Sequence, residues 1–412
     1  MALHTILPSA LILLLGAGLM ATDKSGTVSR PETWSGEINI AGDVTIDRAE
    51  VVVSPGTVIT FAGKGKITVK TGAFLRCQGT EKQPIRWTAP AEPAAVSVSG
   101  GRASLSFCRM AQVSVHASYP QAAPPILTLE DCVLIEGELG CWGQAAVVRR
   151  CYVSAPKKKG SYAVVEMPPE SQVSDNIFEG GSWVSKSMGG AITGNVFISQ
   201  VVPAGGNVND CTHEHICGIH PKARIERNIF IGNSYAAIMS IGAANGDGAL
   251  IRNNTIDMRG KGSGYTAHLT KPKPQGIVLR NNLFLRCQGI NDEEKTPDAI
   301  AFSDYNLFVA AKSRHQGVVM TGRKLGDEGA EKHSLDVADS ASVCVDPDFG
   351  YPLPYSSEQM LSGAATVTEA LQRYHAAYAP KPGSPLIDAG SPEDAADAAD
   401  GRCDIGAVER VQ

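Results

Sequence analysis

The sequence predicts an all-β fold in which short strands wind into a stacked coil, or solenoid. Three observations support this: a register of equivalent positions that returns on average about every 25 residues, a composition rich in chain-breaking residues, and very little helical periodicity. The 412 residues include 43 Gly and 24 Pro, and only 6% are aromatic. Such frequent corners suit short strands, whereas a helical protein carries fewer breakers.

The register is clearest at nine positions that hold Asn or Cys. Each is preceded three residues earlier by an aliphatic residue, with the single exception of Ser303, and is often followed two residues later by Phe. The nine positions are Cys108, Cys132, Cys151, Asn176, Asn195, Asn228, Asn254, Asn282 and Asn306. Columns of this kind arise when coils stack and equivalent side chains bury a continuous core. We expect the Asn side chains to bond backbone groups and one another at a buried turn, in a structural role.

The chain opens with an apolar run from Ile6 to Ala21 that ends in small residues. This pattern is typical of a secretory signal peptide, and the run is too short to span a bilayer comfortably. We therefore assign residues 1–21 as a signal peptide cleaved near Ala21. The protein is expected to be extracytoplasmic, secreted or periplasmic, without stable membrane insertion after cleavage. An uncleaved anchor is the alternative, because the first residues contain no Lys or Arg.

Residues 22–103 are predicted to form an N-terminal cap and the first coils. From Glu37 to Thr88 strand-like runs alternate with turns, such as the one at Pro55 and Gly56. A terminal coil must shield its exposed face and edge, which explains a cap at this end.

Residues 104–309 contain the repeats and three polar insertions, Lys157 to Lys159, Asn207 to Lys222 and Gly260 to Pro274. Insertions in solenoids emerge as loops, often on the binding face. After Val309 the repeat ends, and residues 310–412 are predicted to form a C-terminal capping segment. Its apolar residues between Ala364 and Tyr378 recur at helical spacing and predict one short helix.

The capping segment contains three motifs in order: "VDPDFG" at 345–350, "PGSPLIDAG" at 382–390 and "DGRCDIGAVE" at 400–409. Together with the Asn column, they closely resemble bacterial right-handed parallel β-helix repeat proteins of the pectate-lyase-like superfamily with a choice-of-anchor-type C-terminal segment. The resemblance implies a right-handed parallel β-helix of about ten coils with an asparagine ladder at one corner. It implies no single activity, because the superfamily includes lyases, hydrolases, epimerases and proteins without known catalysis.

The formal net charge of −5 is mild and supports neither a nucleic-acid partner, which we do not expect, nor attraction of a polyanion by the whole molecule. We expect a monomer whose lateral groove binds a polysaccharide. Cleavage by β-elimination is the leading activity, glycoside hydrolysis is the second, and a non-catalytic envelope or surface scaffold is the alternative from another class.

Ten cysteines in an exported protein would normally predict disulfides. Here Cys108, Cys132 and Cys151 occupy ladder positions that later hold Asn. Stacked coils lie about 4.8 Å apart, so strained disulfides between neighbours are geometrically allowed. Small buried thiols that fill a tight turn are the favoured interpretation.

The longest insertion contains Asp210, His213, His215 and His220. In an extended segment His213 and His215 would point the same way, about 6.6 Å apart at their Cα atoms, and could share one divalent ion with a third ligand from His220, Asp210 or Glu214. Imidazole ligands favour a transition metal over calcium. A loop pinned by a Cys211–Cys217 disulfide and a plain polar loop are the alternatives.

A column of charged residues, Glu226, Arg252, Arg280 and Asp304, lies two positions before the Asn column. Its structural interpretation is a ladder of surface ion pairs. Its functional interpretation is that Arg252 and Arg280 bind a uronate carboxylate and acidify the adjacent C–H, which Lys222 or His215 then deprotonates.

Four further residues are candidates for substrate binding. Trp142 and Trp183 lie in Gly-rich corners, and an indole face stacks on a pyranose ring when it is exposed. Lys271 and Lys273 lie in the insertion from Gly260 to Pro274 and would bind acidic sugars. Packing of either Trp into its corner is the structural alternative.

Overall fold

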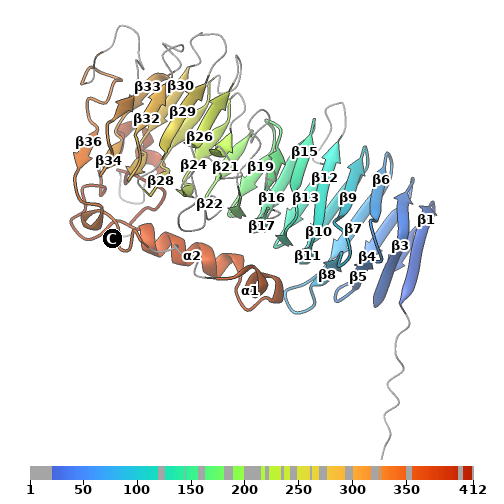
Figure 1. Ribbon diagram of the computed structural model, residues 1–412. Helices are drawn as coiled ribbons and strands as arrows, with labels where there is room; N and C mark the ends of the chain where they lie inside the picture. Colours follow the sequence, from blue (N-terminus) through green and yellow to red (C-terminus); the bar gives the residue numbers. More distant parts are fainter. Residues whose placement is uncertain are drawn as a thin grey trace, which may run out of the picture.

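The computed structural model describes residues 21–118, 126–143, 145–155, 163–180, 189–198, 215–218, 222–232, 236–241, 248–259, 262–268, 276–292, 300–316, 324, 326–348, 355–397 and 402–410. These residues form a right-handed parallel β-helix, as predicted: strands stack in parallel register along one axis and form three faces (Figure 1). Every pairing between strands is parallel in the described part of the chain, isolated bridges aside.

Face 1 is a sheet of 12 strands that precede the Asn corner. They are β2 (Glu32–Trp34), β4 (Glu50–Val53), β7 (Phe74–Gln78), β10 (Arg102–Ser106), β13 (Leu127–Glu130), β16 (Ala146–Arg149), β19 (Gln172–Ser174), β21 (Ala191–Thr193), β24 (Arg224–Glu226), β27 (Leu250–Arg252), β30 (Ile277–Arg280) and β33 (Ile300–Asp304).

Face 2 follows the Asn corner. It comprises β5 (Val58–Phe61), β8 (Ile85–Thr88), β11 (Cys108–Ala111), β14 (Val133–Ile135), β17 (Tyr152–Ser154), β20 (Ile177–Glu179), β22 (Val196–Ile198), β25 (Ile229–Ile231), β28 (Thr255–Asp257), β31 (Leu283–Leu285), β34 (Leu307–Val309) and β36 (Leu335–Val337). Two early strands, β1 (Thr22–Val28) and β3 (Glu37–Ile46), span the corner between faces 2 and 3.

Face 3 closes the coils and consists of two groups of strands, of which the first is joined through β3 to the sheet of face 2 and the second is a sheet of its own. The first contains β6 (Lys66–Lys70), β9 (Ala94–Ser99), β12 (Val113–Ser118), β15 (Leu139–Trp142) and β18 (Val164–Glu166). The second contains β23 (His215–Gly218), β26 (Ala236–Ile241), β29 (Ser263–His268), β32 (Ile290–Asp292) and β35 (His315–Gln316).

The predicted Asn column forms a continuous hydrogen-bonded ladder between faces 1 and 2. From Asn195 onward, each Asn Oδ1 accepts from the backbone N–H and the side-chain Nδ2 of the Asn one coil earlier, as between Asn228 and Asn195 at 2.9 Å for both bonds, while Asn176 Oδ1 accepts from the N–H of Cys151. Each Nδ2 also donates to a backbone carbonyl, such as Ile192 O at 2.8 Å from Asn228. All six Asn are fully buried, so the ladder satisfies backbone groups that would otherwise be orphaned inside.

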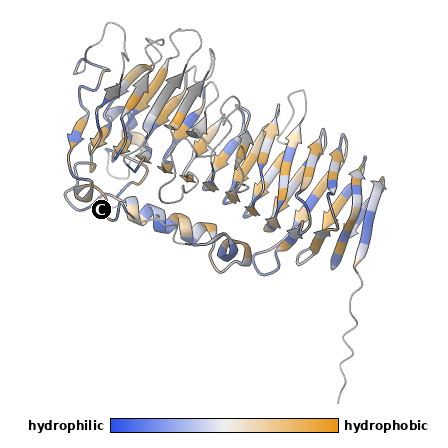
Figure 2. Cartoon of the chain, in the orientation of Figure 1, coloured by the Kyte–Doolittle hydropathy of each residue, from blue (hydrophilic) through white to orange (hydrophobic). Residues whose placement is uncertain are grey.

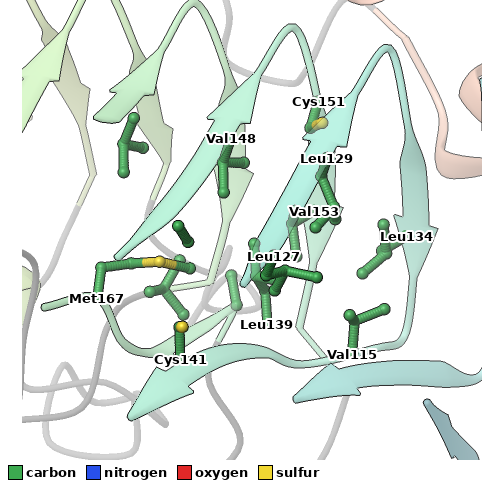
Figure 3. Packing of buried hydrophobic residues seen from close by; sticks show 14 of the residues in the cluster. Val115, Leu127, Leu129, Leu134, Leu139, Cys141, Val148, Cys151, Val153 and Met167 are labelled. Carbon is green, nitrogen blue, oxygen red and sulfur yellow. The ribbon is translucent and has the colours of Figure 1, made fainter. Parts of the chain in front are cut away.

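The interior is filled by the inward side chains of all three faces. Along the early strands, hydrophobic and hydrophilic residues alternate (Figure 2). Leu127, Leu129, Leu134 and Val148 point into this core (Figure 3). The Phe column is stacked, with ring centroids 4.9 Å apart between Phe197 and Phe230. The ladder cysteines Cys108, Cys132 and Cys151 are free buried thiols, which confirms the favoured interpretation.

The end of the coil is capped through Glu331, which explains the polar residue in the aliphatic column. The Glu331 carboxylate, 1% exposed, accepts from the hydroxyl of Ser303 and from Nδ2 of Asn306. Ser334 Oγ accepts from the Asn306 N–H at 2.8 Å, in place of the next Asn. The cap thus ends the ladder without leaving its last amide orphaned.

The C-terminal segment then turns back and runs along face 2. We call residues 355–397 the strap; it contains α1 (Ser357–Ser362), α2 (Val367–Tyr378) and the 3-10 helix η3 (Pro392–Asp397), and follows η2 (Ser340–Ser342). Figure 1 shows α1 and α2 in red-orange along one side of the stack. The predicted helix is confirmed as α2, which begins after a capping box at Thr366 and Glu369. The short helix α1 was not predicted.

The strap covers outward apolar side chains of face 2. They form a second core with the strap residues; the members are Val133, Tyr152, Ile177, Val196, Ile198, Ile229, Ile231, Leu283, Leu285, Leu307 and Val309, packed against Tyr355, Met360, Val367, Leu371, Tyr374 and Tyr378. In the first coils the outward residues of face 2 include Thr60 and Arg86, which need no cover. The strap therefore ends where the apolar surface ends.

Buried ionic groups fix the strap region to the coils. Asp257, fully buried on β28, binds Arg286 and accepts from Tyr378 Oη at 3.0 Å. Burial and the Asp257 carboxylate raise the pKa of Tyr378 well above its usual value, so the hydroxyl remains a donor. Arg286 also binds Asp348 and the carbonyl of Pro347, both within the "VDPDFG" motif. This motif thus anchors the segment that leads to the strap.

The final motif docks on the Asn corner. Asp404, 3% exposed, accepts from the N–H groups of Asp388 and Arg410 at 2.9 and 2.8 Å. The N–H of Gly406 donates to Asn281 O, and that of Ala407 to Thr255 Oγ1. The two last motifs therefore hold each other and close the second core. No helix in the described ranges is long and apolar enough to cross a membrane.

Candidate functional site

The predicted charged column exists, and its arginines are bound by acids. Glu226, Arg252, Arg280 and Asp304 are paired in register on successive coils of face 1. Glu226 binds Arg252 at 3.0 Å, and Asp394 of η3 binds both arginines. The arginine side chains are only 15% and 13% exposed. The structure therefore favours ion pairing over carboxylate binding as the role of Arg252 and Arg280, because both already hold carboxylates of their own chain.

Asp304 at the end of this column has a partner that the sequence did not suggest. It binds His333 Nδ1 at 2.8 Å, the His333 N–H at 2.7 Å and the Tyr305 N–H at 2.9 Å. Tyr305 stacks on the His333 ring, with centroids 4.6 Å apart. Asp304 is 1% exposed, so these bonds compensate a buried carboxylate and hold the cap segment on the last coil.

Several predicted site residues lie outside the described residues: Asp210, His213, His220, Trp183, Lys271 and Lys273. The backbone of His215 opens β23 and pairs with Ala236 on face 3. Lys222 is exposed in the turn before β24, with φ of 57°. The predicted metal site and the base of the proposed elimination are therefore still predictions. In the described part of the chain, no group of three or more His, Cys, Asp or Glu is placed to hold a metal ion.

Trp142 lies on the outer surface of face 3, beside a histidine. It is half-buried at the end of β15, and its ring meets that of His116 on β12 edge to face, with centroids 5.3 Å apart and an interplanar angle of 68°. This contact holds the indole in place while part of it stays accessible. The arrangement suits a stacking platform for a sugar ring.

A row of residues with small hydroxyl side chains crosses neighbouring strands of face 3 and ends at His116. Thr45, Thr68, Ser97 and His116 occupy equivalent positions on β3, β6, β9 and β12. We call these four residues the hydroxyl file. Parallel to it, two residues along each strand, Lys70, Ser99, Ser118 and Trp142 form a second file. The short side chains between the ends of the files, those of Thr68, Ser97, Ser99 and Ser118, leave the backbone surface open to an elongated ligand.

Two lysines give this surface a positive end. Lys66 and Lys70 are exposed on β6, on either side of Thr68, and point outward with it. Their ammonium groups are donors for a carboxylate. The surface thus combines a cationic end at β6 with an aromatic end at β15.

His116 has an unused hydrogen-bonding atom. Its Nε2 is buried and has no hydrogen-bond partner in the described structure. Burial and, to a lesser extent, the positive charge of Lys66 lower the pKa of His116 below its usual value of 6.5, so the ring is neutral at neutral pH. A buried polar atom without a partner is costly, and a ligand hydroxyl would satisfy it only if the surrounding side chains move aside on binding.

The sequence contained a signal for this site that was missed. The segment "VSVHAS" (113–118) alternates strictly, so its hydrophobic residues point inward and Ser114, His116 and Ser118 point outward. The preceding strand "AAVSVS" (94–99) has the same alternation. An outward His between two outward Ser of the same strand could have been identified from period two alone.

No protein-family model matches the chain, and no curated protein matches it in sequence. Among solved structures, the crystal structure of the pectate lyase Pel9A is similar over 87% of this chain and 89% of that chain, with 14% sequence identity and a TM-score of 0.33. A similarity this weak says nothing about activity. The fold assignment rests on the strand pairing itself, and the choice-of-anchor character of the C-terminal segment stays a prediction.

Proposed function

We propose that the protein binds an extended acidic polysaccharide along face 3, between β6 and β15. The observation that carries the proposal is the convergence of Trp142 and the unpartnered Nε2 of His116 at one end of the hydroxyl file. Strands on this face are separated by about 4.8 Å, which is close to the length of one pyranose residue in an extended chain. Successive sugars would therefore meet successive coils.

Each part of the surface has a matching group on the ligand. The indole of Trp142 stacks on a pyranose ring, and the hydroxyls of Thr68 and Ser97 exchange hydrogen bonds with sugar hydroxyls. Lys66 and Lys70 bind uronate carboxylates. Neutral His116 accepts from or donates to a hydroxyl without adding charge.

Cleavage of this polysaccharide by β-elimination is the second part of the proposal. It needs a base and a group that neutralises the uronate carboxylate. His215 opens a face 3 strand and Lys222 is exposed in a nearby turn, so either remains a candidate base. Arg252 and Arg280 serve this chemistry only if η3 leaves them, because Asp394 now occupies both.

Export fits the same proposal. The first strand begins at Thr22, next to the predicted cleavage site at Ala21, so removal of residues 1–21 would not shorten any described strand. An extracytoplasmic location would bring the protein to polysaccharides of the cell surface or the medium.

Binding is tested by titrating oligogalacturonate, oligoalginate and chondroitin sulfate into the mature chain by calorimetry, with a neutral dextran for comparison. We expect an acidic glycan to bind and Trp142→Ala to weaken it roughly tenfold, about 1.4 kcal/mol. Phe74→Ala is the matched control, because Phe74 is a half-buried aromatic residue on face 1. Equal affinity of wild type and Trp142→Ala would refute the proposed site.

Elimination is tested separately by the absorbance of the unsaturated product, with and without added divalent metal. Product that disappears in Lys222→Ala or His215→Ala would support a lyase. Binding without product would leave a polysaccharide-binding protein, and absence of binding to every glycan would favour the non-catalytic scaffold.

A further inference from the structure

A pocket of about 440 Å³ lies where the strap meets the early coils. It is lined by α1 and α2 on one side and by the corner that follows β10, β13 and β16 on the other, and we call it the strap pocket. Its volume is within the range of small-molecule sites. It lies on face 2 and is separate from the polysaccharide surface proposed for face 3.

The lining combines an apolar part with a few charged groups. Phe107, Val133, Met360 and Val367 form the apolar part, and the last three are at least nine-tenths buried. Such a lining favours a ligand with an apolar body, because removing apolar ligand surface from water stabilises the complex.

Most charged groups of the pocket already have partners. Arg150 forms two bonds of 2.8 Å with the carboxylate of Asp131. Glu369 is held by the capping box of α2, where it accepts from the N–H and hydroxyl of Thr366. Two charged residues of the lining are outside these pairs, Arg109 and Glu81, and Glu81 is exposed at the rim.

Arg109 has hydrogen-bonding capacity left. Its Nη1 donates to the carbonyls of Leu361 and Ser362 at the end of α1. A guanidinium carries five N–H donors, so Nε and Nη2 can bind a further acceptor. No ion pair joins Arg109 to a carboxylate among the described residues. Burial and the neighbouring Arg86 lower the pKa of Arg109, as expected for a half-buried cation beside a like charge.

We propose that the strap pocket binds a small organic carboxylate with an apolar body, whose carboxylate pairs with Arg109. The ligand would contact both helices of the strap and the coils beneath them. Because it would bind only when these parts are together, it would stabilise the docked strap by mass action. The first turn of α2 also faces the pocket, and its helix dipole favours an anion there.

Benzoate is a suitable probe, and benzamide is its uncharged counterpart. We expect benzoate to raise the Tm of the full chain in a dose-dependent manner and to bind with a millimolar Kd, and benzamide to do neither. Arg109→Gln should weaken benzoate binding at least tenfold. Arg86→Gln is the matched control, since Arg86 is the exposed neighbour of Arg109 on β8 and should leave binding unchanged.

Arg109 also holds α1, so loss of binding in Arg109→Gln would not by itself separate a lost ligand contact from a displaced helix. A second variant makes this distinction. Thr368→Trp keeps Arg109 but fills the pocket from the first turn of α2, and should abolish binding. Trp142→Ala should bind benzoate normally, so failure on face 3 would not affect this result. Equal effects of benzoate and benzamide, or unchanged benzoate binding by Thr368→Trp, would overturn the proposal.

Discussion

Replacing Asn228 by Ala tests whether the ladder carries a large part of the stability. Asn228 is fully buried in the middle of the ladder. Its Oδ1 accepts from the N–H and the Nδ2 of Asn195, both at 2.9 Å, and its Nδ2 donates to Ile192 O at 2.8 Å and to Asn254 Oδ1 at 3.1 Å. The substitution removes all of these bonds at once.

The magnitude follows from the groups left without partners. Truncation leaves the buried N–H of Asn195 without its Oδ1 acceptor and removes the Nδ2 donor from the carbonyl of Ile192, and each such group costs about 1–3 kcal/mol. The expected loss in the free energy of unfolding is therefore about 2–6 kcal/mol. The other two acceptors of the Asn228 amide, Glu226 O and Asn254 Oδ1, also lose a donor, whereas Nδ2 of Asn195 keeps the carbonyls of Val173 and Thr193.

Urea unfolding of paired variants measures this loss. Asn39→Ala is the control, because Asn39 makes a single exposed bond of 2.8 Å to Asp23 and should change stability by less than about 0.5 kcal/mol. The m values of the variants must agree for the comparison to hold. If Asn228→Ala lowers the free energy of unfolding no more than Asn39→Ala does, the Asn ladder does not contribute a large part of the stability.

Three further outcomes are expected. Tyr378→Phe removes a buried hydrogen bond to Asp257 and should cost about 1–2 kcal/mol, visible as faster proteolysis of the strap. The NMR titration of His116 should give a pKa below 6.5. Because the pKa is lower in the folded than in the unfolded protein, neutral His116 contributes fully to the free energy of unfolding above pH 6.5. This contribution declines as the pH falls from 6.5 towards the folded pKa. Gly363→Ala should lower Tm more than Gly26→Ala; both have positive φ, but only the Cβ at Gly363 would overlap the guanidinium beneath it.

The coil could be predicted because stacking forces a register on the sequence. The columns at Asn228, Asn254 and Asn282 repeat one local environment, and each repeat confirms the others. The helix α2 was also predictable, since its capping box and apolar spacing are local.

The course of the strap was less accessible, because it depends on contacts far apart in sequence. One signal existed: strands such as "IFI" at 229–231 and "LFL" at 283–285 are apolar at every position, which indicates burial on both sides. Nothing local indicated that Asp394 would reach the arginine column 114 positions away. The charges of Arg252 and Arg280 were therefore visible in the sequence, and their partner was not.

The strap changes how the solenoid can come apart. In a plain stack each coil contacts only its neighbours, so the ends can fray independently. Here Arg109 on β11 holds one end of the strap, while Asp394 and Tyr378 fasten the other to β27, β28 and β30. The strap therefore connects coils that lie far apart along the axis, and these coils should unfold as one cooperative unit. A chain cut between 348 and 355 should lose this coupling and melt progressively from its C-terminal coils.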